Sequence, residues 1–170
     1  MAASPLALNT DDANEQHYEV PTEFYDFTLG EHKKYSCCLF DANVNNLSIA
    51  EESMLSVSCE RAEIEDGMQI LELGCGWGSL TLWLGKHYPQ AKVTAVSNST
   101  TQKTYIDRKA AEQGIKNINV VTCDMNDFAT DETFDRVLSI EMFEHMRNYE
   151  TLFERISTWL RPTGKLWFHI

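Results

Sequence analysis

Hydrophobic and polar positions follow two alternating periods along most of the chain, and this alternation predicts an α/β fold. Short apolar runs, each expected to form a strand, stand at residues 68–73, 91–96, 118–122, 135–140 and 165–170. Between them, apolar positions recur every three to four residues, which predicts helices at 78–88, 99–113 and 149–160. Strands separated by helices are typical of βαβ units. The pattern therefore predicts a doubly wound parallel sheet within residues 67–170.

The first 66 residues lack this alternation, and they divide into two segments. Residues 1–16 are polar and weakly patterned, which predicts a disordered tail. Residues 17–66 mix aromatic residues with turn formers, and we expect them to form a helical cap that packs on the sheet. Within this cap, Ser48 and Glu51 have the spacing of a capping box, which predicts a helix that ends near Asp66.

Length, charge and cysteine content narrow the function classes. The 170 residues suffice for one domain with a hydrophobic core. Because the chain has 14 basic and 26 acidic residues, we expect no nucleic-acid partner. The sequence has no basic, apolar leader and no run of roughly 18 apolar residues, so we expect no stable membrane insertion and a cytoplasmic location. Its five cysteines form no CxxC pair, which predicts neither a disulfide framework nor a metal site.

The most informative motif is the glycine-rich turn LELGCGWG at residues 71–78, which joins the first strand of the sheet to a helix. Ligands of doubly wound sheets bind at the carboxyl ends of the strands, so a cofactor site is expected here. A phosphate loop of the nucleotide-hydrolase type is excluded, since no lysine follows the turn. A dinucleotide site is weakly supported, because the third glycine comes one residue early and the second strand ends in Ser97 and Asn98 without an acid. The turn suits S-adenosylmethionine, and the plainer alternative is a turn that only closes the junction.

A second group of polar residues follows the strand at 135–140, in the segment SIEMFEHM. Glu141 and Glu144 lie three residues apart, so a helical turn would place both carboxylates on one face, with His145 beside them. A carboxylate or an imidazole can remove the proton of an amine, and a carboxylate also stabilises an approaching cation. We therefore expect general-base chemistry at the same edge of the sheet. The plainer interpretation is a helix start with acidic residues at its positive end.

Several segments together resemble one enzyme family. They are YSCCLF, ERAEIEDG, ILELGCGWGSL, SNSTTQK and FDRVLSIEMFEHM. Over about residues 17–170, their order and spacing are similar to those of the S-adenosylmethionine-dependent methyltransferases grouped with cyclopropane fatty acid synthases, especially the plant branch similar to coclaurine N-methyltransferase. The resemblance implies a doubly wound, Rossmann-like methyltransferase sheet, an N-terminal helical cap that contributes to the cofactor site, and S-adenosylmethionine as the cofactor.

The resemblance also implies which residues bind the cofactor. The cap would close over it, the glycine turn would line its methionine part, Asn98 and Gln102 would meet the ribose, and Asp124 with Met125 would lie at the adenine. The implied cofactor-binding residues are Tyr35, Ser36, Glu72, Gly74, Cys75, Gly76, Trp77, Gly78, Asn98, Gln102, Asp124, Met125 and Asn126.

The reaction that the resemblance implies is N-methylation of a small-molecule amine acceptor. Glu144 and His145 would form the base pair, and Glu141 would orient the cationic substrate. Cyclopropane synthases suggest a rival chemistry, methylene transfer to a lipid, with a bicarbonate ion whose ligands would correspond to Cys37, Glu144 and His169. The synthases carry a small residue at the position of Glu141, and the net negative charge does not favour anionic membranes, so the amine is the preferred substrate class.

Full-length relatives continue beyond the position of Ile170, through two more strands and an acceptor-binding region. We therefore expect a core at residues 67–170 that is truncated after its fifth strand and lacks much of the acceptor pocket. The last strand would be an exposed apolar edge, with Trp167 and Ile170 uncovered, and open to self-association or to a completing subunit. A fragment, a truncated isoform and a split enzyme all fit, and so does a non-catalytic interaction protein that retains the motifs.

Overall fold

The computed structural model describes residues 4–7 and 22–170, and at its centre lies a five-stranded sheet. Its strands are β1 (Gln69–Leu73), β2 (Lys92–Ser97), β3 (Ile118–Thr122), β4 (Phe134–Ile140) and β5 (Leu160–His169). Their order in the sheet is β3-β2-β1-β4-β5, and every neighbouring pair is parallel. The chain moves outward from β1 to β3 and then returns to the other side of β1. This arrangement confirms the predicted doubly wound fold.

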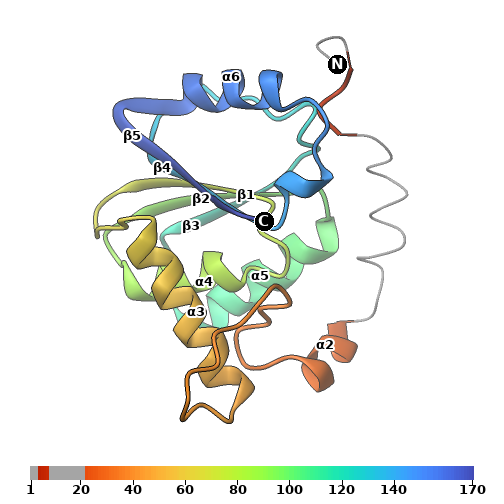
Figure 1. Cartoon of the computed structure of the whole chain (residues 1–170), viewed down its shortest axis with the longest axis vertical. Helices are drawn as coiled ribbons and strands as arrows, with labels where there is room; N and C mark the ends of the chain where they lie inside the picture. Colours follow the sequence, from red (N-terminus) through yellow and green to blue (C-terminus); the bar gives the residue numbers. More distant parts are fainter. Residues whose placement is uncertain (1–3, 8–21) are drawn as a thin grey trace.

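Helices cover both faces of the sheet (Figure 1). Helices α3 (Leu47–Arg61), α4 (Ser79–His87) and α5 (Thr100–Gln113) lie on one face, and α6 (Tyr149–Trp159) lies on the other. The described part of the cap also contains α2 (Thr22–Thr28), and a 3-10 turn, η1 (Phe143–His145), follows β4.

The hydrophobic core consists of layers on the two sides of the sheet. Neighbouring residues of a strand point to opposite faces. Ile70 of β1 accordingly packs with Leu55 and Leu84 on the α3 and α4 side, whereas Leu71 belongs to the cluster that contains Ile156 of α6. Because both faces are covered, the central strands β1 and β4 are buried along most of their length, as is usual for parallel sheets.

The last strand differs most from its predicted boundaries. The strands β1 to β4 and the helices α4, α5 and α6 begin and end within one residue of the predicted positions, whereas β5 begins at Leu160, not at residue 165. Pro162 and Gly164 are responsible for the error, since both residues usually indicate a loop. β5 is an edge strand, however, and Pro162 lies between Leu160, which pairs with Phe134, and Lys165, which pairs with Arg136, at a register shift where such a strand tolerates proline.

The predicted start of α3 is also wrong. Asn46 caps this helix, because its Oδ1 atom accepts hydrogen bonds from the N–H groups of Ser48 and Ile49 at 2.9 and 3.3 Å. The side chain of Glu51 does not hydrogen-bond back to the first turn of the helix, so there is no capping box. The helix ends at Arg61, several residues before the expected position.

The predicted tail and the first residues of the cap lie largely outside the described residues, and the described part of the tail, residues 4–7, contacts the core. Leu6 is 3% exposed. Its N–H donates to Oδ1 of Asn126 at 2.8 Å, and its carbonyl accepts from the N–H of Arg147 at 2.7 Å. Ala7 forms an antiparallel bridge with Met146. This segment therefore connects the loop after β3 with the segment after η1.

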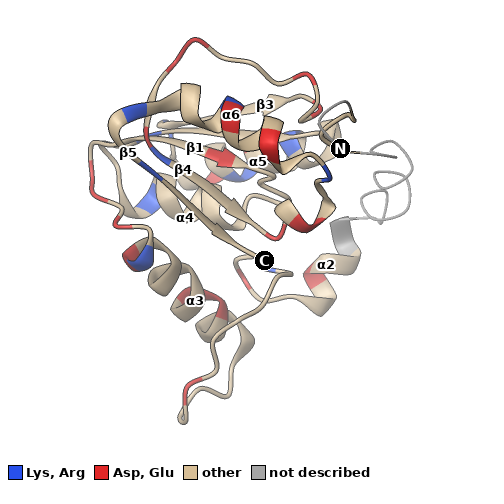
Figure 2. Ribbon diagram, turned by 45° about the horizontal axis from the view of Figure 1, so that its top comes forward, with Lys and Arg blue, Asp and Glu red and all other residues tan. Residues whose placement is uncertain are grey.

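Acidic residues are distributed over α2, α3, α6 and the connecting loops (Figure 2). Among residues 4–7 and 22–170, no helix combines the length and the apolar character that crossing a membrane requires.

Candidate active site

A cavity of about 260 Å³ lies at the carboxyl ends of β1 and β4, the place where ligands of doubly wound sheets bind. The cap, the glycine turn and the segment after β4 all contribute to its wall. The sequence-predicted residues in the wall are Tyr35, Ser36, Glu72, Gly74, Cys75, Gly76, Trp77, Glu141, Glu144 and His145. The fold therefore brings the predicted methionine-binding turn and the predicted base together.

The glycine turn has a backbone that requires glycine. Gly74, Gly76 and Gly78 have φ angles of 77°, 53° and 80°, in the left-handed region. A Cβ atom on Gly76 would lie 2.7 Å from the hydroxyl of Tyr35. A Cβ atom on Gly78 would lie 2.5 Å from Ile106 of α5, and Gly78 is outside the cavity wall. Gly76 thus allows the cap to approach the cavity, whereas Gly78 allows two helices to pack.

Glu72 supplies a buried carboxyl group at the floor of the turn. It is 4% exposed, and its Oε2 atom accepts a hydrogen bond from the hydroxyl of Thr81 at 2.6 Å. Burial raises the pKa of Glu72 to about 8, although the hydrogen bond from Thr81 acts in the opposite direction. At neutral pH, Glu72 therefore holds its proton for most of the time.

Three buried polar atoms at or near the turn have no hydrogen-bond partner among the described residues. They are Nε1 of Trp77, Oγ of Ser79 and Nε2 of Gln102, and the first two residues line the cavity. Buried donors are normally satisfied, so these atoms are suited to a ligand that carries acceptor oxygens. The carboxylate and ribose hydroxyls of S-adenosylmethionine are such acceptors, so the residues present fit this cofactor.

The remaining predicted cofactor residues continue along the same edge of the sheet, beyond the cavity. Asn98 and Gln102 follow β2, where Gln102 is 2% exposed and accepts a hydrogen bond from the hydroxyl of Ser97 at 2.6 Å. Asp124 and Met125 follow β3.

The side chain of Asn126, next in the chain, has a structural role. Its Oδ1 atom accepts from the N–H groups of Leu6 and Ala7 at 2.8 and 3.2 Å, and its amide donates to the carbonyl of Ala7 at 3.3 Å. These bonds hold the N-terminal segment, so contact between the Asn126 side chain and a cofactor stays a prediction.

The predicted base residues occupy the turn after β4. Glu141 is half-buried and has a φ angle of 49°, and its N–H donates to the carbonyl of His169 at 2.7 Å. Glu144 and His145 lie in η1, where both side chains are exposed while lining the cavity. The expected helical turn is therefore a 3-10 turn.

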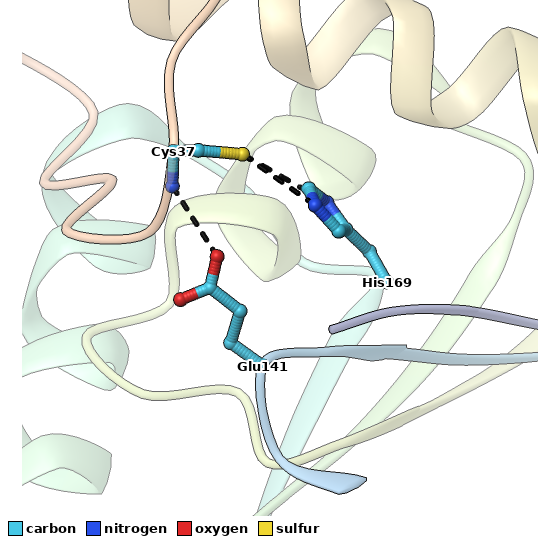
Figure 3. Close-up of side chains that lie close together, drawn as sticks. All are labelled: Cys37, Glu141 and His169. Carbon is cyan, nitrogen blue, oxygen red and sulfur yellow. Dashed lines mark hydrogen bonds between the residues drawn. The ribbon is translucent and has the colours of Figure 1, made fainter. Parts of the chain in front are cut away.

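Cys37 and His169 lie together, but with a different carboxylate from the one expected for a bicarbonate site (Figure 3). The Sγ atom of Cys37 is 3.5 Å from Nε2 of His169, and the N–H of Cys37 donates to Oε1 of Glu141 at 3.4 Å. The interpretation based on cyclopropane synthases grouped Glu144 with this pair. In the structure, Glu141 takes that place, because its left-handed backbone turns the side chain toward the cap.

Glu51 is a buried residue that holds the cap next to the cavity, a role that its position in the sequence did not indicate. It is 0% exposed, and its carboxylate accepts from the N–H groups of Gly30, His32 and Lys34 at 2.9, 2.8 and 3.3 Å. No local motif predicts bonds across this separation in sequence.

The sequence did not indicate the place of Lys34 in the cavity wall either. The pair Lys33–Lys34 has the pattern of a solvated surface, yet Lys34 is 3% exposed and its ammonium donates to the hydroxyl of Ser36. Burial lowers the pKa of Lys34, whereas the neighbouring Cys37 and Glu141 favour the charged form.

A second cavity, of about 450 Å³, lies between the cap and helices α4 and α5. Although it is larger, its wall contains none of Glu141, Glu144 and His145. The smaller cavity, where the turn and these residues meet, is therefore the candidate active site.

Comparisons with known proteins agree with this assignment. The sequence pattern of the family described as mycolic acid cyclopropane synthetase matches residues 8–170. The (S)-coclaurine N-methyltransferase of Thalictrum flavum subsp. glaucum is 40% identical over 161 residues, which are 95% of this chain and 45% of that protein. The cyclopropane-fatty-acyl-phospholipid synthase of Escherichia coli (strain K12) is 29% identical over 156 residues, 91% of this chain and 39% of that protein. The chain thus spans less than half the length of these two relatives.

Solved structures give the same result. The crystal structure of coclaurine N-methyltransferase bound to N-methylheliamine and SAH superimposes with a TM-score of 0.95 at 41% identity, and the match covers 98% of this chain and 48% of that one. The mycolic acid cyclopropane synthase CmaA1 complexed with SAH and CTAB has a TM-score of 0.82 at 24% identity over 92% of this chain and 55% of that one, which supports the fold alone. These matches confirm the resemblance found in the sequence: the chain belongs to the mycolic acid cyclopropane synthetase family.

Proposed function

We propose that this chain forms the S-adenosylmethionine-binding part of a methyltransferase that methylates the nitrogen of a small amine. The observation that carries the proposal is that the glycine turn and the group Glu141, Glu144 and His145 line one cavity. A methyl donor held at the turn would then lie close to a base that can deprotonate its acceptor. The 40% identity to an N-methyltransferase supports the same reaction.

The cofactor, when bound, supplies a methyl group attached to a sulfonium cation. On the proposed assignment, Gly74 and Gly76 admit its methionine part close to the backbone, while Tyr35 and Ser36 cover it from the cap. Asn98 and Gln102 bind the ribose, and the unpaired Nε2 atom of Gln102 is a suitable donor for a hydroxyl.

The acceptor amine must lose a proton before its lone pair can attack the methyl carbon. Glu144 and His145 are proposed as the base pair, and their exposure allows the proton to pass on to solvent. The half-buried carboxylate of Glu141 is proposed to orient the cationic amine before transfer, because a partly desolvated anion attracts a cation more strongly than an exposed one.

Methylene transfer to an unsaturated lipid is the second candidate, and the pair formed by Cys37 and His169 favours it, since this pair matches two of the ligands expected for bicarbonate. The amine remains the better acceptor, because Glu141 places a carboxylate beside this pair where the synthases carry a small residue, and a carboxylate suits a cationic amine better than an apolar lipid chain. The net charge of -12 also opposes attraction to anionic membranes.

The base assignment is tested in a chimaera that joins residues 1–170 to the C-terminal half of the coclaurine N-methyltransferase of Thalictrum flavum. We expect transfer of labelled methyl groups to small amines, and we expect Glu144→Gln to lower kcat by roughly 10²- to 10⁴-fold, the usual contribution of a general base. The affinity for S-adenosylhomocysteine should stay the same, since Glu144 is proposed to act on the acceptor.

Glu150→Gln is the matched control, since Glu150 is an exposed carboxylate in the first turn of α6 and lies outside the cavity wall. Unchanged methylation by the Glu144→Gln chimaera would show that Glu144 is not the base. A preference for unsaturated phospholipid over every amine in the panel would replace the proposed acceptor class.

A further inference from the structure

Three metal-ligating side chains from distant parts of the chain lie close together, those of Cys37, Glu141 and His169 (Figure 3). Cys37 belongs to the cap, Glu141 follows β4, and His169 ends β5. One ligand atom from each residue lies within 4.8 Å of those from the other two. The cysteine spacing predicted no metal site, because the three ligands are far apart in sequence and only the fold makes them neighbours.

The distances suit a tetrahedral ion. A zinc ion bonds thiolate sulfur at about 2.3 Å and imidazole nitrogen at about 2.0–2.1 Å, so two such ligands of a tetrahedron lie roughly 3.5 Å apart. The Sγ atom of Cys37 is 3.5 Å from Nε2 of His169. The carboxylate of Glu141 is the third potential ligand: one of its oxygens lies within 4.8 Å of the ligand atoms of Cys37 and His169, and Oε1 also accepts from the N–H of Cys37 at 3.4 Å (Figure 3).

The backbone supports this arrangement. The N–H of Glu141 donates to the carbonyl of His169 at 2.7 Å, which fixes two of the three ligand-bearing residues relative to each other. Glu141 adopts a left-handed backbone conformation, with φ at 49°, that a residue with a side chain rarely takes. The Cys37 side chain is exposed and the other two are half-buried, so an ion can reach the three ligands from solvent.

The chemistry of the three ligands selects the ion. Thiolate and imidazole bind zinc well and bind Mg²⁺ or Ca²⁺ poorly, since these hard cations prefer oxygen. Two of the ligands are anionic when bound and balance the charge of a divalent ion.

We propose that Cys37, Glu141 and His169 form a Zn²⁺ site with three protein ligands and one water, which ties the cap to the ends of β4 and β5. A bound ion takes up the carboxylate of Glu141, which lines the cavity. Zn²⁺ therefore also inhibits amine methylation, and this second consequence rests on the proposed function.

The site is tested by titrating the reduced chain with ZnCl₂ in competition with a chromophoric chelator. We expect one saturable site, and we expect Cys37→Ser, Glu141→Gln and His169→Asn each to weaken the Kd at least about tenfold, since even residues that only support metal ligands contribute 10–100-fold. The matched controls, Cys38→Ser, Glu144→Gln and His145→Asn, should keep the Kd of the unmodified chain.

Co²⁺ provides a second readout that does not depend on any variant. A thiolate-to-metal charge-transfer band in the unmodified chain, absent in Cys37→Ser and present in Cys38→Ser, is the expected result. The proposal is overturned if the chain shows no saturable Zn²⁺ binding, if Cys38→Ser weakens binding as much as Cys37→Ser, or if Co²⁺ gives no thiolate band. None of these outcomes depends on methyl transfer, so the proposed function stands or falls separately.

Discussion

Glu72 shows how burial changes the chemistry of a single residue. Its pKa rises from 4.5 to about 8 because the carboxyl group is buried beneath the glycine turn. The folded chain thus keeps this proton up to about pH 8, whereas the unfolded chain releases it above about pH 4.5. Between these values the unfolded state binds fewer protons, so the free energy of unfolding falls as the pH rises.

Glu72→Gln removes this dependence on pH. We expect the free energy of unfolding of the variant, relative to that of the unmodified chain, to rise by about 2–4 kcal/mol between about pH 5 and about pH 8. Urea denaturation at both pH values measures this change. If the free energies of unfolding of the variant and of the unmodified chain differ by the same amount at both pH values, Glu72 is ionised in the folded protein.

Gly76 and Gly114 form a matched pair that separates backbone strain from a role in the cofactor site. Both have positive φ angles, but a Cβ atom on Gly76 would meet Tyr35, whereas one on Gly114 would meet nothing within 4 Å. Either alanine variant should lose roughly 1–2 kcal/mol of stability from the left-handed backbone.

Only Gly76→Ala should weaken the binding of S-adenosylhomocysteine, by at least about tenfold, or 1.4 kcal/mol, because it displaces the cap from the turn. Calorimetric titration of the two variants checks this prediction. Equal affinities in both would assign Gly76 to the turn geometry alone.

Single residues also mark the limit of what could be predicted from the sequence. The positions of the glycine turn and of Glu141 follow from the ends of predicted strands, and these ends meet in any parallel sheet. Which carboxylate approaches Cys37 depends on the left-handed backbone of Glu141, and no motif predicts that conformation. Glu51 and Lys34 are buried through contacts with distant segments, so their spacing resembles that of ordinary surface residues.

Among the elements, β5 departs furthest from expectation. Its neighbours could be placed from apolar periodicity, because both of their faces are buried and each run has a clear start and end. β5 is an edge strand that contains a proline and a glycine, so its first half lacks that signal. The expected exposure was correct for Ile170, which is 66% exposed, and wrong for Trp167, which packs with the cluster beneath α3 and α4.

The exposed apolar side chains on β5 and α6 lead to a prediction about association. Phe168 and Phe153 are each 41% exposed, with ring centroids 6.3 Å apart, and Ile170, two residues after Phe168, is 66% exposed. Such a surface next to an unpaired strand favours self-association. We expect the sedimentation coefficient of this chain to rise with concentration, and Ile170→Lys to reduce this rise. A monomer at all concentrations would exclude association through this edge.

At the scale of the whole molecule, the fold and the family were predictable, because the order of several motifs agrees with the βαβ pattern over most of the chain. The chain spans 45% of the length of the coclaurine N-methyltransferase it resembles. That span contains the sheet, the glycine turn and the proposed base. Cofactor binding can therefore be tested with this chain alone.

The central claim is that the cavity at the ends of β1 and β4 binds S-adenosylmethionine. Calorimetric titration of the chain with S-adenosylhomocysteine tests it most directly, with NADH as the control for a dinucleotide site. We predict saturable binding with one ligand per chain and no heat from NADH. A folded chain that does not bind S-adenosylhomocysteine, or that binds NADH in its place, would contradict the claim.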